Sequence, residues 1–314
     1  MARILGAIGR LLIGVGLLLL AFVAFQLWGT GLEESSNQDA LANEIGSSLG
    51  VSASGDDPIA QLTQQLGVIN TEAAPATEPP QEGQAAGVIV IPRIGVSKVF
   101  VEGTAKVDLK KGPGHYQGTP LPGQAGNSAI AGHRTTYGAP FNRIDELSPG
   151  DQIEIYTAQG KFIYEVMAPP DNQGIERGAG YWTVRPEQGE VVGPLEGGGN
   201  MLTLTACHPK YSAKQRIIVR AKLTTPPAAT PVIADTPQAP QPTETDDLDK
   251  SFAGDPDALT TAILWGVLCA AIFLVAWFAS RRWRKWPTYL LATPLFLGAL
   301  WFCFIYTDRY LPSL

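Results

Sequence analysis

The chain has 314 residues, and its 29 acidic residues outnumber its 23 basic residues, which gives a formal net charge of −6. This balance argues against nucleic-acid binding, because proteins of that class present a strongly basic surface. The three cysteines and three histidines are dispersed, so they lack the ligand spacing of a metal site, and we expect neither a metal nor another cofactor.

Residues 1–28 are predicted to form a membrane anchor. Residues 11–28 are almost wholly apolar, and about 20 apolar residues suffice to cross a bilayer. Arg3 and Arg10 precede this run, and the next basic residue is Arg93. By the positive-inside rule, the amino terminus then stays in the cytoplasm and the following region lies outside. A cleaved signal peptide is the alternative, but the apolar run is long and no convincing small-residue cleavage site follows it.

Residues 29–86 are predicted to form a flexible stalk outside the membrane. They are rich in Ala, Gln, Ser, Gly and acidic residues, with few aromatic residues and no basic one. Such a composition buries too little apolar surface to offset the entropy of ordering the chain. We therefore expect this segment to act as a spacer.

Residues 87–223 have a different character. Short runs rich in Val, Ile, Phe and Tyr, such as GVIVIP, SKVFVEG, DQIEIYT and RIIVRAKL, are separated by turn-forming clusters such as LPGQAGN, LSPGD and LEGGGN. Many short strands with turn signals between them predict an all-β barrel or sandwich. The length of this segment suffices for one compact core.

Residues 202–222 contain two apolar-alternating runs joined by a short polar loop, which predicts two antiparallel strands. Because side chains alternate across a strand, Cys207 faces away from the core with Thr205, and Arg216 shares a face with Ile218. A cation beside a thiol lowers the thiol pKa and raises the fraction of the nucleophilic thiolate. A buried structural cysteine with a surface arginine is the alternative interpretation.

The carboxyl-terminal part adds a linker and two further spans. Residues 224–257 are rich in Pro, Thr and Ala and predict an extended linker. Residues 258–280 and 287–307 carry no charge and are long enough to cross a bilayer. The basic and aromatic residues 281–286 between them predict a cytoplasmic loop, which places residues 308–314 outside. These two spans either anchor the chain, which we expect, or offer a docking surface for another membrane protein.

Three histidines are candidates for acid–base chemistry. His208 adjoins Cys207, but neighbouring strand residues point to opposite faces, so it is poorly placed to act on that thiol. His133 follows an apolar strand and enters a loop rich in Gly and Thr, which is where rigid frames often carry reactive groups. His133 is therefore the better candidate. His115 lies in a loop rich in Gly and Pro and either lines a groove or caps a turn.

The segments HYQGTPLPGQAGNSAIAGHRTTYGAPF and TLTACHPKYSAKQRIIV resemble sortases, the membrane-anchored cysteine transpeptidases of Gram-positive bacteria. The likeness covers residues 87–223 and is greatest to the class E, housekeeping-type branch of actinobacteria. It implies a sortase-type barrel of about eight strands with short helices. It also implies that Cys207 is the nucleophile, His133 the catalytic histidine and Arg216 the arginine that binds substrate and oxyanion.

The resemblance further implies that the enzyme cleaves an LPxTG-like or LAxTG-like sorting signal between Thr and Gly through a thioester on Cys207. An amine of a lipid-linked cell-wall precursor then takes the surface protein. We expect Thr205, His115, Tyr137 and Ile218 to contact the substrate. Both partners lie at the outer membrane surface, so the catalytic domain is expected to face outward.

Two extra carboxyl-terminal spans depart from the class E pattern and raise the alternative of a class C enzyme that polymerises pilins. The amino-terminal segment has no evident lid motif of the Asp-Pro-aromatic kind, which weighs against class C. Two other hypotheses stay open. They are a cysteine hydrolase that uses water as the acceptor and a non-catalytic adhesion or scaffold domain.

Overall fold

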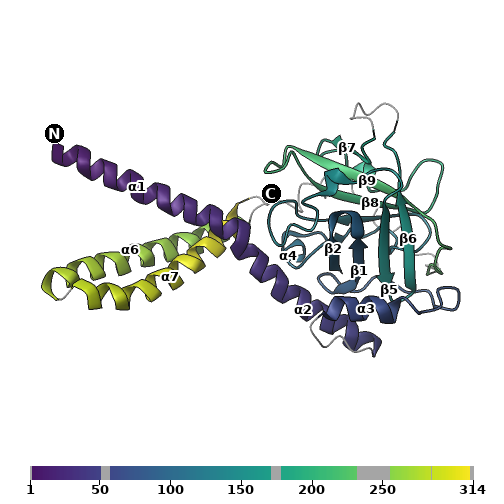
Figure 1. The fold of residues 1–314 in the computed structure, drawn as a ribbon, viewed down its shortest axis with the longest axis horizontal. Helices are drawn as coiled ribbons and strands as arrows, with labels where there is room; N and C mark the ends of the chain where they lie inside the picture. Colours follow the sequence, from purple (N-terminus) through teal and green to yellow (C-terminus); the bar gives the residue numbers. More distant parts are fainter. Residues whose placement is uncertain (1, 51–56, 171–177, 232–254, 284, 312–314) are drawn as a thin grey trace. The chain divides into compact units, whose positions relative to one another are not determined.

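The structure is a computed structural model that describes residues 2–50, 57–170, 178–231, 255–283 and 285–311. The chain forms two compact units (Figure 1). One combines residues 1–26 with residues 253–313, and the other consists essentially of residues 27–252. Most of the predicted linker, residues 232–254, lies outside the described residues.

The larger unit is an all-β barrel. Among the described residues, one sheet has the strand order β6-β5-β1-β2-β3-β4-β8-β9-β7, and β6 also pairs with β9. This last pairing closes eight strands into a ring and leaves β7 outside it, attached to β9, so the predicted barrel of about eight strands is confirmed. The strands are β1 (Ala85–Ile91), β2 (Val96–Glu102), β3 (Gly114–His115), β4 (Asn127–Ala131), β5 (Gln152–Thr157), β6 (Gly160–Val166), β7 (Tyr181–Val184), β8 (Met201–His208) and β9 (Gln215–Leu223).

The barrel interior follows from side-chain alternation along the strands. On β8 and β9, every second residue joins the buried apolar core: Leu202, Leu204, Ala206, Ile217, Val219 and Ala221. The residues between them point to the other face of the sheet. The pleat of β8 and β9 therefore puts the core side chains on one face of the sheet and the alternate side chains on the other.

Short helical elements connect the strands, as predicted. They are η2 (Pro92–Ile94), α4 (Lys106–Leu109), η3 (Ile144–Glu146) and η4 (Gly189–Val191).

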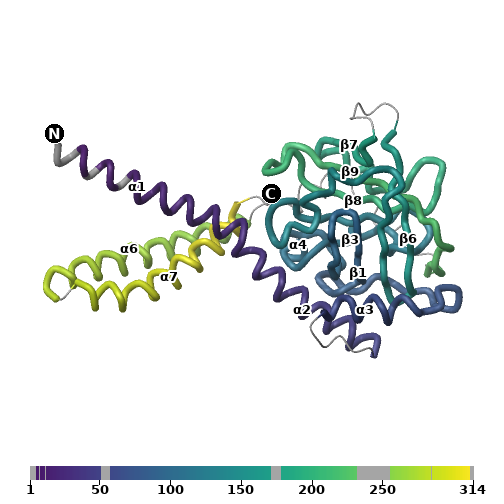
Figure 2. The backbone as a smooth tube through the Cα atoms, in the orientation of Figure 1, coloured from purple at the N-terminus to yellow at the C-terminus, as the bar shows by residue number. Residues whose placement is uncertain are grey.

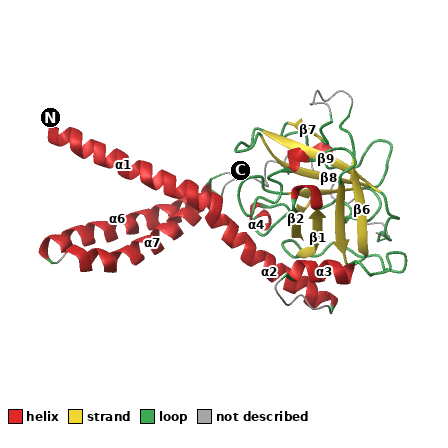
Figure 3. Cartoon of the chain, in the orientation of Figure 1, coloured by secondary structure: helices red, strands yellow, loops and turns green. Residues whose placement is uncertain are grey.

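The amino-terminal part of the barrel unit corrects the prediction of a flexible stalk over residues 29–86. This segment contains α2 (Thr30–Leu49) and α3 (Pro58–Leu66), and both helices pack against the barrel wall (Figures 2 and 3). Their apolar side chains form one buried cluster with the outer face of β1, β2 and β5: Leu41, Ala42, Ile45, Leu62, Leu66, Val88, Val99, Val101 and Tyr156. The average composition of residues 29–86 did not reveal these two helices. A few apolar residues on one side of each helix are enough for it to dock.

Gln38 of α2 completes the hydrogen bonding of β2. Its side-chain oxygen accepts from the Val99 N–H at 2.7 Å, and its Nε2 donates to the Val99 carbonyl at 2.9 Å and to the Lys111 carbonyl at 2.8 Å. β3 pairs with β2 at Val101 and Glu102. The glutamine thus satisfies the backbone of Val99 in the place of a strand partner.

The smaller unit consists of apolar helices. They are α1 (Ala2–Ala24), followed by the π-helical turn η1 (Phe25–Gly29), and the hairpin of α6 (Ala258–Arg282) and α7 (Lys285–Tyr310). Within the described part of the chain, three helices are long and apolar enough to cross a membrane. α6 and α7 extend into the predicted loop 281–286, since Arg281 and Arg282 form the last turn of α6, where basic residues favour the helix dipole.

Aromatic and polar contacts join α1 to α7. The ring of Phe25 lies 5.0 Å from that of Trp301, and Phe22 lies 5.2 Å from Phe304. Gln26 Nε2 donates to the Asp308 carboxylate at 2.9 Å. Packing of this kind and hydrogen bonds between helices stabilise helix association in a bilayer.

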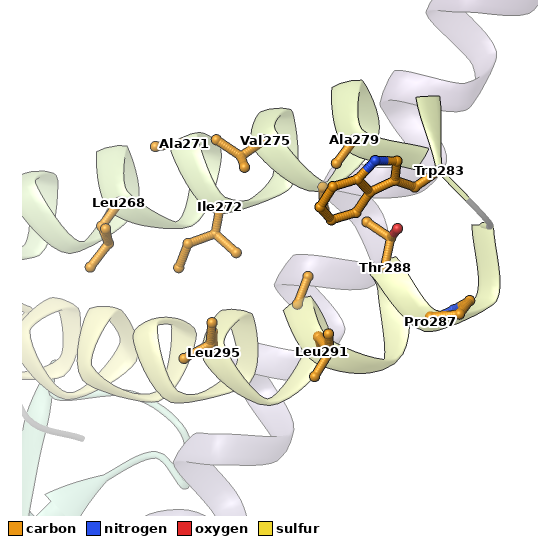
Figure 4. A pocket seen from close by; sticks show the side chains of 12 residues that line it. Leu268, Ala271, Ile272, Val275, Ala279, Trp283, Pro287, Thr288, Leu291 and Leu295 are labelled. Atoms are coloured by element: carbon orange, nitrogen blue, oxygen red, sulfur yellow. The ribbon is translucent and has the colours of Figure 1, made fainter. Parts of the chain in front are cut away.

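A cavity of about 740 Å³ lies between α6 and α7 near their connection (Figure 4). Side chains such as Leu268, Val275, Leu291 and Leu295 line it, and the indole of Trp283 lies at one end. The described lining is almost wholly apolar, with the hydroxyl of Thr288 as its polar side-chain group beside the indole N–H of Trp283.

Candidate active site

Cys207 and Arg216 face each other across the last pairs of β8 and β9. They are direct register partners in this antiparallel ladder. Cys207 belongs to a small buried cluster outside the barrel core, with Leu109, Tyr116, Ala129, Ala131 and Val192. The hairpin predicted from the alternating pattern therefore places the thiol and the guanidinium on the outer face of the sheet.

His133 reaches the same end of β8 from the neighbouring strand. β4 runs parallel to β8 with Ala131 opposite Thr205, and the Gly132 N–H donates to the Thr205 carbonyl at 3.0 Å. The paired register ends there: His133 lies two residues beyond Ala131, as Cys207 lies two residues beyond Thr205. The residue between Ala131 and His133 has to be glycine. A Cβ on Gly132 would lie 2.5 Å from the ring of Phe141.

Tyr137 packs beside the imidazole of His133, with ring centroids 5.2 Å apart. Its backbone has a φ of 51°, an uncommon conformation for a non-glycine residue. The Tyr137 N–H donates to the Thr30 hydroxyl of α2 at 3.1 Å, and Lys110 Nζ lies 4.8 Å from the centre of the Tyr137 ring. The loop after His133 is thus held from both α2 and α4.

Arg134 is a site residue that the sequence reasoning missed. Its side chain is 2% exposed, and its Nη1 donates to the Cys207 carbonyl at 3.3 Å and to His208 Nδ1 at 3.0 Å. Its Nη2 forms an ion pair with Asp145 at 2.8 Å. The sequence offered one signal for Arg134, which is a cationic residue directly after His133 at the end of a strand.

Two guanidinium groups act on the thiol. Burial raises the pKa of Cys207, whereas the positive charges of Arg216 and Arg134 act in the opposite direction. The pKa of His208 is lowered by burial and then by the charge of Arg134. A neutral His208 is consistent with its Nδ1 accepting a hydrogen bond from Arg134.

Thr205 and Ile218 flank the central pair on the same face. They are register partners of each other, one outward-facing position before the pair of Cys207 and Arg216. The Thr205 hydroxyl shares a hydrogen bond of 2.9 Å with the hydroxyl of Tyr116. Ile218 packs with Trp182 and Val184 of β7. The structure therefore brings both predicted substrate contacts next to the thiol.

The position of His115 does not support the substrate contact expected for it. The residue is part of β3, inside the barrel wall, and its ring is fully buried. Nδ1 lies 2.7 Å from the Glu102 carboxylate, and Nε2 lies 2.9 Å from the Thr119 hydroxyl. The sequence predicted that His115 lies in a loop and lines a groove or caps a turn, but pairing with β2 and β4 makes it part of a strand and encloses its ring.

The candidate site is covered in this structure. Cys207 is 1% exposed, Arg216 is 1% exposed and His133 is fully buried. Val191 and Ala213 pack against the cluster around the thiol. Substrate entry therefore requires movement of covering side chains or loops.

Comparisons with known proteins point to one family. Residues 89–224 match the family described as the sortase domain. Sortase SrtE1 of Streptomyces coelicolor is 32% identical to the chain over 229 residues, which is 69% of this chain and 56% of that protein. Sortase SrtE2 of the same organism is 27% identical over 242 residues, which is 71% of this chain and 83% of that protein. The chain thus spans little more than half the length of the first of these relatives.

Among solved structures, sortase E from Streptomyces avermitilis is 36% identical to this chain, with a TM-score of 0.39. The match covers 51% of this chain and 99% of the sortase E chain. The match over the barrel and the two curated relatives agree on the family. Through residues 89–224, the chain belongs to the sortase family.

Proposed function

We propose that this chain is a membrane-anchored cysteine transpeptidase in which Cys207 is the nucleophile, His133 the general acid and base, and Arg216 the oxyanion-binding residue. The observation that carries this proposal is the direct pairing of Cys207 with Arg216, with His133 two residues beyond the end of β4, the strand that pairs in parallel with β8. Thiolate, imidazole and guanidinium at one strand end supply the groups that acyl transfer needs.

The reaction has two halves. The Cys207 thiolate attacks a peptide carbonyl, and Arg216 stabilises the negative charge on the tetrahedral oxygen. His133 as imidazolium then protonates the departing amine, so that the C–N bond breaks and a thioester remains. In the second half, an incoming amine attacks the thioester, His133 takes up its proton, and Cys207 leaves as thiolate.

The buried position of the site favours transfer to an amine over hydrolysis. Cys207, Arg216 and His133 have almost no contact with solvent. Once substrate has entered and the covering side chains close over the thioester, water reaches it less readily than it would reach an exposed thioester. A hydrolase with the same residues, the second candidate, would benefit from a site open to solvent.

The substrate class follows from the similarity to sortases SrtE1 and SrtE2. The proposed donor is a surface protein with an LAxTG-like or LPxTG-like sorting signal, cleaved between Thr and Gly. The proposed acceptor is an amine of a lipid-linked cell-wall precursor. Three apolar helices and the basic residues Arg3, Arg10, Arg281 and Arg282 support a multi-pass protein with its barrel outside the cell.

The test uses the full chain in detergent micelles with fluorescent LAxTG and LPxTG peptides, each with and without triglycine. We expect a peptide–triglycine conjugate, and the Cys207→Ala variant should form neither this product nor a thioester. A cleavage rate and product indifferent to triglycine would identify a hydrolase. Undiminished product from Cys207→Ala would refute the nucleophile assignment.

A further inference from the structure

Arg134 is a buried charge whose contacts all lead to the candidate site. A guanidinium that is 2% exposed is costly to bury unless other groups satisfy it. The partners of Arg134 come from two elements: the end of β8, at the Cys207 carbonyl and His208 Nδ1, and η3, at Asp145. The planar fork suits such a set, because Nη1 reaches both acceptors of β8 while Nη2 reaches Asp145.

The loop that carries His133 is closed on itself by backbone hydrogen bonds. The Phe141 N–H donates to the His133 carbonyl at 3.1 Å, and Asn142 Nδ2 donates to the Arg134 carbonyl at 2.9 Å. These bonds fix the shape of the loop. The side chain of Arg134 ties this loop to the backbone of the nucleophile itself, because it spans from the residue after His133 to the carbonyl of Cys207.

We propose that Arg134 is a positioning residue of the transpeptidase, which holds the imidazole of His133 in register with Cys207 and places a second fixed positive charge beside the thiol. The inference rests on the proposed roles of Cys207 and His133. Asp145 orients Arg134 from the opposite side, as its carboxylate accepts from Nη2.

The positive charge of Arg134 acts on the thiol in the direction that its proposed role requires. Burial raises the pKa of Cys207, and the charges of Arg216 and then Arg134 act against this rise. The other titratable groups near Arg134 are His208, whose pKa is lowered, and Asp145. His208 Nδ1 faces Nη1 of the guanidinium, and the Asp145 carboxylate pairs with Nη2.

The test compares full-length variants in micelles by two measurements. The first is the rate of Cys207 alkylation by iodoacetamide as a function of pH, which reports the thiol pKa. The second is kcat and KM for peptide transfer to triglycine. Arg134→Met should move the alkylation midpoint to higher pH and lower kcat by about 10- to 100-fold, the cost of a misplaced catalytic group, with little change in KM.

Two further variants separate charge from position. Arg134→Lys keeps the charge but loses the planar fork, so its alkylation midpoint should stay close to that of the unaltered chain while kcat falls. Asp145→Asn keeps the guanidinium and removes its outer anchor, and should lower kcat less than Arg134→Met. This second variant decides the matter if Arg134→Met does not fold.

Arg220→Met is the matched control. Arg220 of β9 carries a half-buried guanidinium that donates to the Val191 carbonyl at 2.9 Å and packs on the ring of Trp182. It should leave both the alkylation midpoint and kcat unchanged. Folded Arg134 and Asp145 variants that match the unaltered chain in both measurements would overturn the inference. Activity that survives Cys207→Ala would instead overturn the proposed function.

Discussion

At the scale of single residues, Arg216 serves both the fold and the proposed chemistry. Its Nη1 donates to the Ala213 carbonyl at 2.8 Å and to the Gln215 carbonyl at 3.1 Å, which orders the turn between β8 and β9. The same guanidinium lies opposite Cys207 in the ladder. Removing it therefore affects loop order and charge stabilisation together.

We expect Arg216→Ala to lower kcat by about 100-fold or more, in line with the loss of one oxyanion donor. Arg216→Lys should recover part of this loss, because it restores a charge without the fork. Steady-state transfer kinetics measure both, and thermal unfolding of each variant checks the fold. Near-normal turnover in a folded Arg216→Ala variant would remove the oxyanion role.

For single residues, the sequence could predict which face of a strand a side chain occupies, but not which distant segments surround it. Side-chain parity along two strands sufficed to place Cys207, Thr205, Arg216 and Ile218 on one face, because alternation is a property of the strand itself. The environments of His115 and Arg134 depend on segments distant in sequence, Glu102 for the first and Asp145 with β8 for the second. A single sequence does not reveal these pairings.

At the scale of elements, α2 and α3 are part of the barrel unit rather than a spacer. Leu62 of α3 is fully buried, in the cluster with Val88 and Val99 of the barrel wall. Asp57 caps α3 by accepting from the Ala60 N–H at 3.0 Å, and Pro58 occupies its first turn. Capping and a narrow apolar stripe were readable in the sequence, but the average polarity of residues 29–86 outweighed them.

Leu62→Ala should destabilise the barrel unit by about 2–5 kcal/mol and lower its unfolding midpoint by about 4–20 °C, because it leaves a cavity between α3 and the sheet. Val68→Ala is the control, since Val68 is 84% exposed. Differential scanning fluorimetry of the full chain measures both shifts. Equal midpoints for the two variants would mean that α3 is not docked.

At the scale of the whole molecule, the proposed topology puts the barrel and the α6–α7 connection on opposite sides of the membrane. Tyr211, in the turn between β8 and β9, is 65% exposed, and Trp286, near the start of α7, is 88% exposed. Both positions accept a reporter cysteine without loss of buried contacts. They therefore give a direct test of orientation.

In cells that produce the Cys207→Ala background, Tyr211→Cys should react with a membrane-impermeant maleimide without permeabilisation. Trp286→Cys should react only after permeabilisation, because the positive-inside rule places residues 281–286 in the cytoplasm. Gel-shift labelling reads out both. The reverse pattern would place the barrel inside the cell and contradict the proposed substrates.

Gln38 has a consequence for any shortened version of this protein. It occupies the main-chain donor and acceptor of Val99 from outside the sheet. A barrel shortened to begin at β1 would leave these main-chain groups of β2 unpaired. Unpaired strand edges can pair with strands of other chains. We therefore expect a chain that lacks α2 to self-associate more readily than the full chain.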